Sequence, residues 1–292
     1  MDYYRLSSLF RAYDLSLGTN RGILLLSAAG AAVGAVLGLV AGQPPAAWLM
    51  KALLGGATPF AAAALAKEID PDHPGSAVLA TALAVPVVGV TRPESLPALL
   101  WLLIALRFIN RSTGLAPKVT DTLALLLLTG WLVWDGGPLL AGLRFASPLY
   151  GVLAGAVLFI DALLPGGRRA HGVLGGLVGG GAVVYWIANA GRFPPQPHET
   201  WLGIALLAVA MGMTGVILTC YVILMPGDAT GRPLDSARFQ AAQIVALAAG
   251  LSFASWHGHD GTALFVGLWT ALIGAVIMYW VHAGERRTPT TS

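Results

Sequence analysis

Long apolar runs constrain this chain more than any other feature of its sequence. They recur from one end to the other, each about 15 to 24 residues long, with polar connections between them. A membrane-spanning α-helix needs about 20 consecutive apolar residues, whereas the strands of an outer-membrane barrel alternate apolar and polar residues. The runs therefore predict an all-α, polytopic integral membrane helix bundle and exclude a transmembrane barrel.

The composition excludes most soluble classes of protein. Of the 292 residues, 56% are hydrophobic and only 11% are charged, where a soluble domain carries about 25% charge. The mean hydropathy is +0.73. The single cysteine, Cys220, gives no disulfide framework. The net charge of +3 comes without a basic block, so nucleic acid is not an expected partner.

About ten segments are predicted to be transmembrane helices. The third and fourth are short, about 15 residues each, and cover only some 22 Å, so they either span the bilayer or form a re-entrant hairpin. Together the segments define one transmembrane domain over residues 22–283, with a tail at 284–292. In chain order they are 22–42, 46–66, 76–91, 95–109, 118–134, 146–164, 171–190, 201–225, 239–256 and 262–283.

The amino-terminal segment 1–21 is predicted to lie on the membrane. It has no apolar core followed by a small-residue cleavage site, so we do not expect it to be a cleavable signal peptide. Its aromatic and leucine residues recur at spacings of three and four, with arginines between them. This pattern favours an amphipathic helix in the membrane interface.

The lysines and arginines predict which side each connection faces. With the amino terminus inside, thirteen of them fall in inner segments and three in outer segments, and Lys51 lies near the outer start of the second helix. Connections rich in lysine and arginine stay in the cytosol. Both termini are therefore expected in the cytosol, in a multi-pass protein of the cell (inner) membrane.

Two segments carry ridges of glycine at helical spacing. Such ridges let helix backbones approach closely, within one chain or between copies in an oligomer. The ridge residues are Gly30, Gly34 and Gly38 in the first segment, and Gly175, Gly176, Gly179 and Gly180 in the seventh.

The loop after the second segment is acidic. Glu68, Asp70 and Asp72 lie within five residues, and Pro71 and Pro74 keep the loop from being helical. Carboxylates that converge in this way can hold Mg²⁺, which prefers oxygen ligands and bridges to substrate phosphate. The loop is therefore a candidate Mg²⁺ site, and the alternative is a solvated connection between two helices.

The loop after the fourth segment is a candidate anion site. Arg107, Asn110 and Arg111 occupy one helical face, and a serine, a threonine, a glycine and then Lys118 follow. Arginine, amide and hydroxyl groups suit phosphate oxygens. Arg232, in the loop at 226–238, is expected on the same side. The alternative is that these charges only satisfy the positive-inside rule.

Two carboxylates are candidate catalytic residues, because charge is costly inside a membrane segment. Asp121 is expected at a helix amino terminus, where the helix dipole favours an anion. Asp161 is expected near a helix carboxyl terminus, where the dipole opposes its charge. We therefore expect Asp161 to pair with the face that bears Arg107 and Arg111. The outer side offers only His257, His259 and Asp260, in an expected turn between the last two segments.

Three functions remain open. The first is a membrane enzyme with a cytosolic-face polar site for a phosphate-bearing substrate, which we expect to be an isoprenoid or another lipid. The placement of its polar loops distantly resembles that in intramembrane prenyltransferases, although the stretch KEIDPDHPG lacks that family's aspartate-rich motif. The second is a small-molecule transporter, because ten segments with both ends inside resemble the five-plus-five drug/metabolite transporters. The third is a non-catalytic subunit of a membrane complex.

Overall fold

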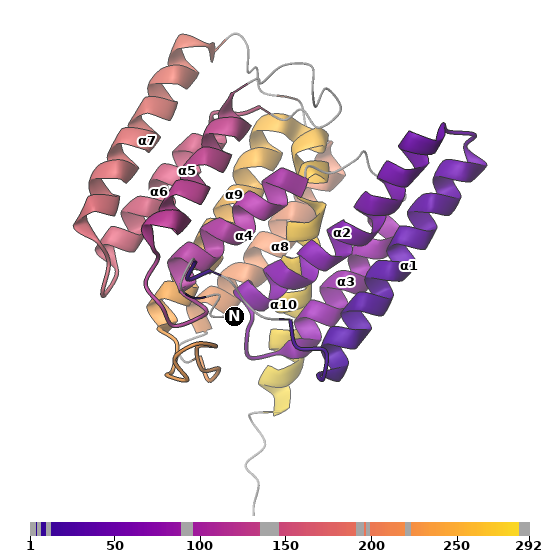
Figure 1. Cartoon of the computed structure of the whole chain (residues 1–292), viewed down its shortest axis with the longest axis horizontal. Coiled ribbons are helices and arrows are strands. Elements are labelled where there is room, and N and C mark those ends of the chain that lie inside the picture. Colours follow the sequence, from indigo (N-terminus) through magenta and orange to yellow (C-terminus); the bar gives the residue numbers. More distant parts are fainter. Residues whose placement is uncertain are drawn as a thin grey trace, which may run out of the picture.

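The computed structural model describes residues 4, 7–9, 13–88, 96–134, 146–190, 196, 199–219 and 223–285. The described residues form ten α-helices (Figure 1). They are α1 (Gly18–Val40), α2 (Pro45–Ile69), α3 (Pro74–Val88), α4 (Leu96–Asn110), α5 (Val119–Val133), α6 (Leu149–Leu163), α7 (Arg169–Ala188), α8 (Thr200–Thr219), α9 (Ser236–Leu264) and α10 (Val266–Glu285).

Each predicted segment overlaps one of these helices over most of its length. Five of them, namely α1, α2, α7, α8 and α9, are long and apolar enough to cross a membrane, and the others are shorter apolar helices. The chain therefore has the helices of an integral membrane protein. That all ten cross the bilayer stays a prediction.

The polar connections gather at one end of the bundle. Figure 1 shows the junctions α2–α3, α4–α5, α6–α7 and α8–α9 at the lower end, with the α1–α2 junction at the opposite end. This is the grouping that the lysine and arginine residues predict. That the shared end faces the cytosol rests on the same charge rule.

The short helix α4 lies in the centre of the bundle. It is apolar on all sides, as a helix surrounded by others must be, and Trp101, Leu102 and Phe108 are fully buried. It packs against α2, α5, α6 and α9, whereas α3 packs mainly against α1, α2 and α10. The described parts of α3 and α4 therefore do not pair as a re-entrant hairpin.

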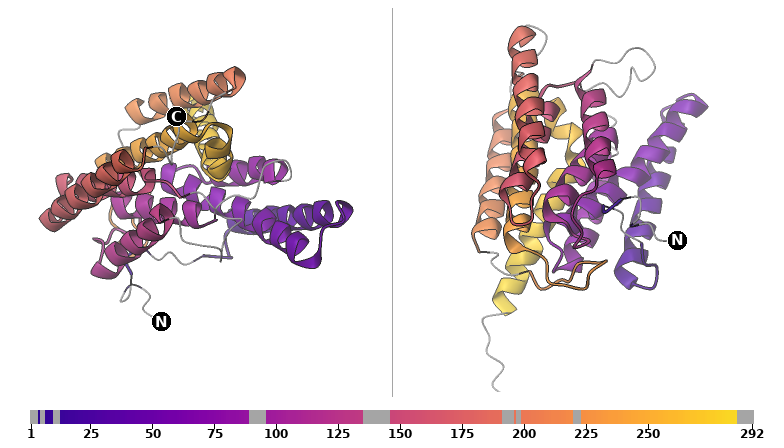
Figure 2. Two further views of the ribbon diagram at one scale, coloured as in Figure 1. Left: turned by 90° about the horizontal axis from the view of Figure 1, so that it is seen from above. Right: turned by 60° about the vertical axis from the view of Figure 1, so that its left-hand side comes forward.

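Two hairpins depend on glycine for close packing. A Cβ atom on Gly30 of α1 would lie 2.3 Å from the carbonyl oxygen of Gly55 in α2, and one on Gly155 of α6 would lie 2.5 Å from the Cα of Gly179 in α7. Figure 2 shows the α1–α2 pair and α7 at opposite ends of the molecule. The ridge of α1 and the glycines Gly175 and Gly179 of α7 therefore serve helix packing, whereas Gly176 and Gly180 of α7 meet open space.

The described residues of the amino-terminal segment before α1 are mostly non-helical, with residue 4 in a 3₁₀ turn, and that this segment lies in the membrane interface stays a prediction. Its described residues 7–9 and 13–17 are not helical, and α1 begins only at Gly18. Residues 7–9 instead hydrogen-bond to side chains at the ends of α4 and α5. Polar contacts with the bundle thus hold the described part of this segment, and the remainder of 1–21 lies outside the described residues.

The expected turn at His257, His259 and Asp260 is present as a sharp break in α9, and helical residues continue beyond it to Leu264. The helix kinks at Gly258, whose φ of 57° is a conformation that glycine adopts without a steric cost. His257 Nε2 lies 3.1 Å from the hydroxyl of Ser147.

Candidate functional site

Asp161 is the centre of a buried polar cluster at the end of the bundle where the connections gather. Its carboxylate has no exposed area. Arg111 Nη2 donates to Oδ1 at 2.8 Å and Arg238 Nη1 donates to the same oxygen at 2.9 Å. His171 Nδ1 lies 2.7 Å from Oδ2. One carboxylate on α6 therefore joins α7, α9 and the loop after α4.

Arg111 reaches Asp161 through an unusual backbone conformation. It follows the last residue of α4 and has a φ of 50°, in the left-handed region. Glycine is the usual residue in that position after a helix, and any other residue costs roughly 1 kcal/mol there. The conformation lets the guanidinium donate to Asp161 and also to the carbonyl of Gly166 at 3.1 Å.

Two residues of the cluster were not predicted from the sequence. Arg238 also donates to the carbonyls of Ile109 at 3.0 Å and Pro165 at 2.7 Å. His171 lies near the start of α7, and its Nε2 is 3.3 Å from the hydroxyl of Thr122. The available signal was that both residues flank connections on the same side as Asp161.

Arg107 and Asn110 bind a different carboxylate. Arg107 Nε donates to Glu68 Oε1 at 2.8 Å, and Asn110 Nδ2 donates to Oε2 at 3.0 Å. Glu68 is fully buried at the end of α2. The predicted face is therefore divided: Arg107 does not pair with Asp161, because the helix ends at Asn110 and only Arg111 turns toward α6.

The three candidate Mg²⁺ ligands have separate partners. Asp72 accepts the backbone N–H groups of Leu224 at 3.1 Å and Met225 at 2.9 Å, while Glu68 binds Arg107. In the described part of the chain, no three His, Cys, Asp or Glu residues are grouped as metal ligands would be. In this arrangement the three carboxylates do not fit a Mg²⁺ site.

Asp70 is a buried carboxylate with one unused oxygen. Its Oδ1 lies 2.7 Å from His73 Nδ1, and its Oδ2 is buried with no hydrogen-bond partner among the residues that the structure describes. Burial raises the pKa of Asp70, and the hydrogen bond with His73 opposes the rise. Asp70 therefore belongs to a small cluster with His73, apart from the Asp161 cluster.

Asp121, the second candidate catalytic residue, is buried under the amino-terminal segment. It accepts the hydroxyls of Ser7 and Ser8, each at 2.6 Å. It also accepts the backbone N–H groups of Ser8 at 3.1 Å and Lys118 at 2.8 Å. The bond with Lys118 caps the first turn of α5, and four donors together explain how the charge is buried.

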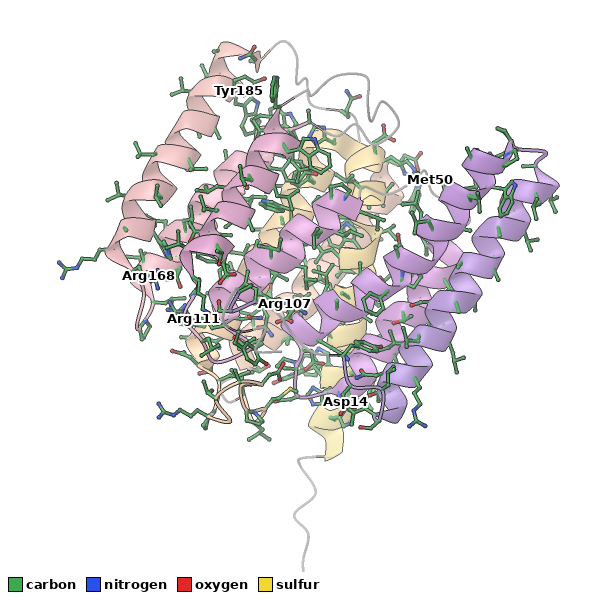
Figure 3. All side chains as sticks on the ribbon, viewed as in Figure 1. Asp14, Met50, Arg107, Arg111, Arg168 and Tyr185 are labelled. Atoms are coloured by element: carbon green, nitrogen blue, oxygen red, sulfur yellow. The ribbon has the colours of Figure 1, made fainter. Side chains whose placement is uncertain are left out.

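Exposed arginines surround the cluster at the same end. Arg168 and Arg169 begin α7 and Arg232 lies in the loop 226–238, and all three are exposed. Figure 3 shows Arg168 pointing away from the bundle, while Arg107 and Arg111 lie within it. The loop that carries Arg232 hydrogen-bonds to the loop after α4, but Arg232 itself is exposed and is not a member of the buried cluster.

The Asp161 cluster has more positive than negative charge, and it has hydrogen-bond donors that its own acceptors leave unpaired. One carboxylate faces two arginines, so the cluster is positive even when His171 is neutral. Within the described part of the chain, Arg111 Nε is a buried donor without a hydrogen-bond partner, and so is Ser112 Oγ on the next residue of the loop. Buried donors without acceptors are uncommon in proteins. This arrangement can therefore accept an anion.

The chain was compared with protein-family models, with curated proteins and with solved structures, and no match was found.

Proposed function

We propose that the protein is an integral membrane enzyme that binds a phosphate-bearing lipid where α4, α6, α7 and α9 meet. The observation that carries this proposal is Arg111 Nε, a buried donor with no partner among the described residues, on a guanidinium that shares the Asp161 carboxylate with Arg238. Ser112 Oγ, on the next residue of the loop, is a second buried donor of this kind. Phosphate oxygens form strong, charge-assisted hydrogen bonds with guanidinium groups. Arg111 keeps 12% of its side chain exposed, so the cation is reachable from this end of the bundle.

Exposed apolar side chains beside the cluster favour a lipid substrate. Leu163, at the end of α6, is 71% exposed, and Val173, in the first turns of α7, is 68% exposed. The exposed Arg168 and Arg169 lie between them in the chain. Such a surface suits a molecule with an apolar tail and an anionic head group, such as an isoprenyl diphosphate.

Asp161 and His171 provide the acid–base chemistry in this proposal. Asp161 fixes His171 through Nδ1, which leaves Nε2 directed at the hydroxyl of Thr122. A histidine oriented by a carboxylate and placed beside a hydroxyl can accept and return a proton at Nε2. Asp161 then acts as a positioning residue, and His171 takes the role that the sequence analysis gave to Asp161.

A five-plus-five transporter is the second candidate function. It is favoured by the two glycine-packed hairpins, α1–α2 and α6–α7, because they occupy the first two positions of each five-helix half. The fourth helices of the two halves, α4 and α9, also pack against each other in the centre. Internal repeats of this kind are common in secondary transporters.

Binding to the purified full chain in lipid nanodiscs tests the proposal. We expect an isoprenyl diphosphate to bind at least tenfold more tightly than the uncharged isoprenyl alcohol of the same length. Arg111→Gln should abolish this preference, whereas Arg21→Gln, a change to an exposed arginine of α1, should keep it. Equal affinity for the two lipids, or a preference that survives Arg111→Gln, would contradict the proposal. Uptake of the lipid into proteoliposomes without chemical change would favour the transporter.

A further inference from the structure

The described residues 4 and 7–9, here called the strap, cover the ends of α4 and α5. Three of their backbone carbonyl oxygens accept hydrogen bonds from side chains of the last turn of α4 and of the loop that follows it. Arg107 Nη1 donates to the carbonyl of Leu9 at 3.1 Å, and Thr113 Oγ1 donates to that of Ser8 at 2.7 Å. Lys118 Nζ donates to the carbonyl of Tyr4. An arginine, a hydroxyl and a lysine thus all use oxygen atoms of the strap as acceptors.

A second set of bonds holds the strap in place. Ser7 and Ser8 donate their hydroxyls, and Ser8 its backbone N–H, to the carboxylate of Asp121. Asp121 is 2% exposed and Ser8 is 1% exposed, so this contact excludes water. The strap therefore contacts the bundle in two ways: its donors bind the carboxylate of Asp121, and its carbonyl oxygens accept from two cations and one hydroxyl.

We propose that the strap occupies a phosphate subsite formed by Arg107, Thr113 and Lys118, and that a phosphate group displaces it. The three donors are of the kinds that bind phosphate oxygens in proteins. A carbonyl oxygen carries only a partial charge, so a phosphate oxygen binds the same cations more strongly. This inference rests on the proposed function and extends it, because it assigns a second phosphate position, formed by residues that flank Arg111 in the chain, and a segment that controls access to it.

The hydrogen bonds to Asp121 determine the free energy that is needed to open the strap before a ligand can bind. A ligand that needs the strap to be open binds with an affinity reduced by the fraction of molecules that are open. Removing the hydroxyls of Ser7 and Ser8 weakens the closed state and leaves Arg107, Thr113 and Lys118 unchanged. Affinity for phosphate should therefore rise in such a variant, although no group of the subsite has been altered.

The experiment measures binding of inorganic pyrophosphate to the full chain by calorimetry, together with hydrogen exchange of the peptide that contains Ser8. In the double variant Ser7→Ala/Ser8→Ala we expect about tenfold tighter binding than in the wild type. Ser16→Ala is the matched control, because Ser16 is an exposed serine outside the strap. In the wild type, saturating pyrophosphate should accelerate exchange at Ser8, whose amide is bonded to Asp121.

The outcomes separate this inference from the proposed function. Unchanged or weaker pyrophosphate binding in the double variant would overturn the strap inference, and the Arg111-dependent preference for an isoprenyl diphosphate would still stand. Slower exchange at Ser8 on binding would also overturn it, because the strap would then be part of the bound site. Absence of pyrophosphate binding in every variant, together with no Arg111-dependent lipid preference, would contradict both.

Discussion

At the scale of single residues, the candidate site depends on how Arg111 ends α4. Helices commonly end with a glycine in the left-handed conformation, because a side chain is strained there. Here an arginine adopts that conformation, and its guanidinium binds the buried Asp161. Strain of this kind persists where surrounding contacts compensate for it. The ion pair with Asp161 and the bond to the carbonyl of Gly166 are those contacts.

Two single substitutions of Arg111, to alanine and to glycine, separate the effect of its left-handed backbone strain from the effect of its ion pair with Asp161. Both Arg111→Ala and Arg111→Gly remove the bond to Asp161, so both should be less stable than the wild type. Glycine also relieves the left-handed strain, so Arg111→Gly should be more stable than Arg111→Ala by about 1 kcal/mol. Thermal unfolding of the purified protein in one detergent measures the difference. An alanine variant as stable as the glycine variant would show that the left-handed conformation is not required.

At the scale of helices, close backbone contact defines the two hairpins. Gly175 of α7 faces α6, and a Cβ atom there would lie 2.6 Å from the carbonyl oxygen of Gly155. The next residue, Gly176, has no atom within 4 Å of such a Cβ. Neighbouring glycines of one ridge thus have different roles, which the spacing in the sequence does not reveal.

This difference gives a matched pair of variants. Gly175→Ala should force α6 and α7 apart and lower the free energy of unfolding by roughly 1–3 kcal/mol. Gly176→Ala meets open space and improves helix propensity, so it should be neutral or stabilising by up to about 1 kcal/mol. Unfolding of the two variants in the same detergent compares them directly. Equal destabilisation by both substitutions would contradict the observed α6–α7 interface.

At the scale of the whole molecule, the sequence predicts the helices well and the polar cluster only in part. The helices follow from apolar runs, which are a local property of the chain. The pair between Arg111 and Asp161 was predicted because a buried charge near a helix carboxyl terminus needs a basic partner. The partners Arg238 and His171 come from other helices, and only the tertiary packing of α7 and α9 brings them to Asp161.

The candidate Mg²⁺ ligands and the strap show the limits of reading loops one by one. Carboxylates that are close in the sequence predict a shared metal site, yet Glu68 binds Arg107 and Asp72 binds the backbone N–H of Met225. The contact between Ser8 and Asp121 joins residues that are 113 positions apart, and no periodic pattern in the sequence predicts it. Specific polar pairs between distant segments are therefore what the structure adds.

The grouping of the connections at one end predicts their accessibility. In a Cys220→Ser background, single cysteines replace Ala116 or Ala229 at the charged end, or Ala46 at the opposite end; all three residues are exposed. In intact cells an impermeant maleimide should label Ala46→Cys and leave Ala116→Cys and Ala229→Cys unlabelled until the membrane is permeabilised. Labelling of both Ala116→Cys and Ala229→Cys in intact cells would reverse the predicted orientation.

Photo-crosslinking with an isoprenyl diphosphate analogue tests the central claim most directly, namely that the cluster around Asp161 is a site for a phosphate-bearing lipid. The probe carries its photoreactive group beside the diphosphate, and the full chain in nanodiscs is digested and sequenced by mass spectrometry after irradiation. The account predicts adducts in peptides that span residues 107–118 and 165–173, and competition by unlabelled isoprenyl diphosphate but not by the alcohol. Adducts confined to the opposite end of the bundle, or adducts that the alcohol removes equally well, would contradict it.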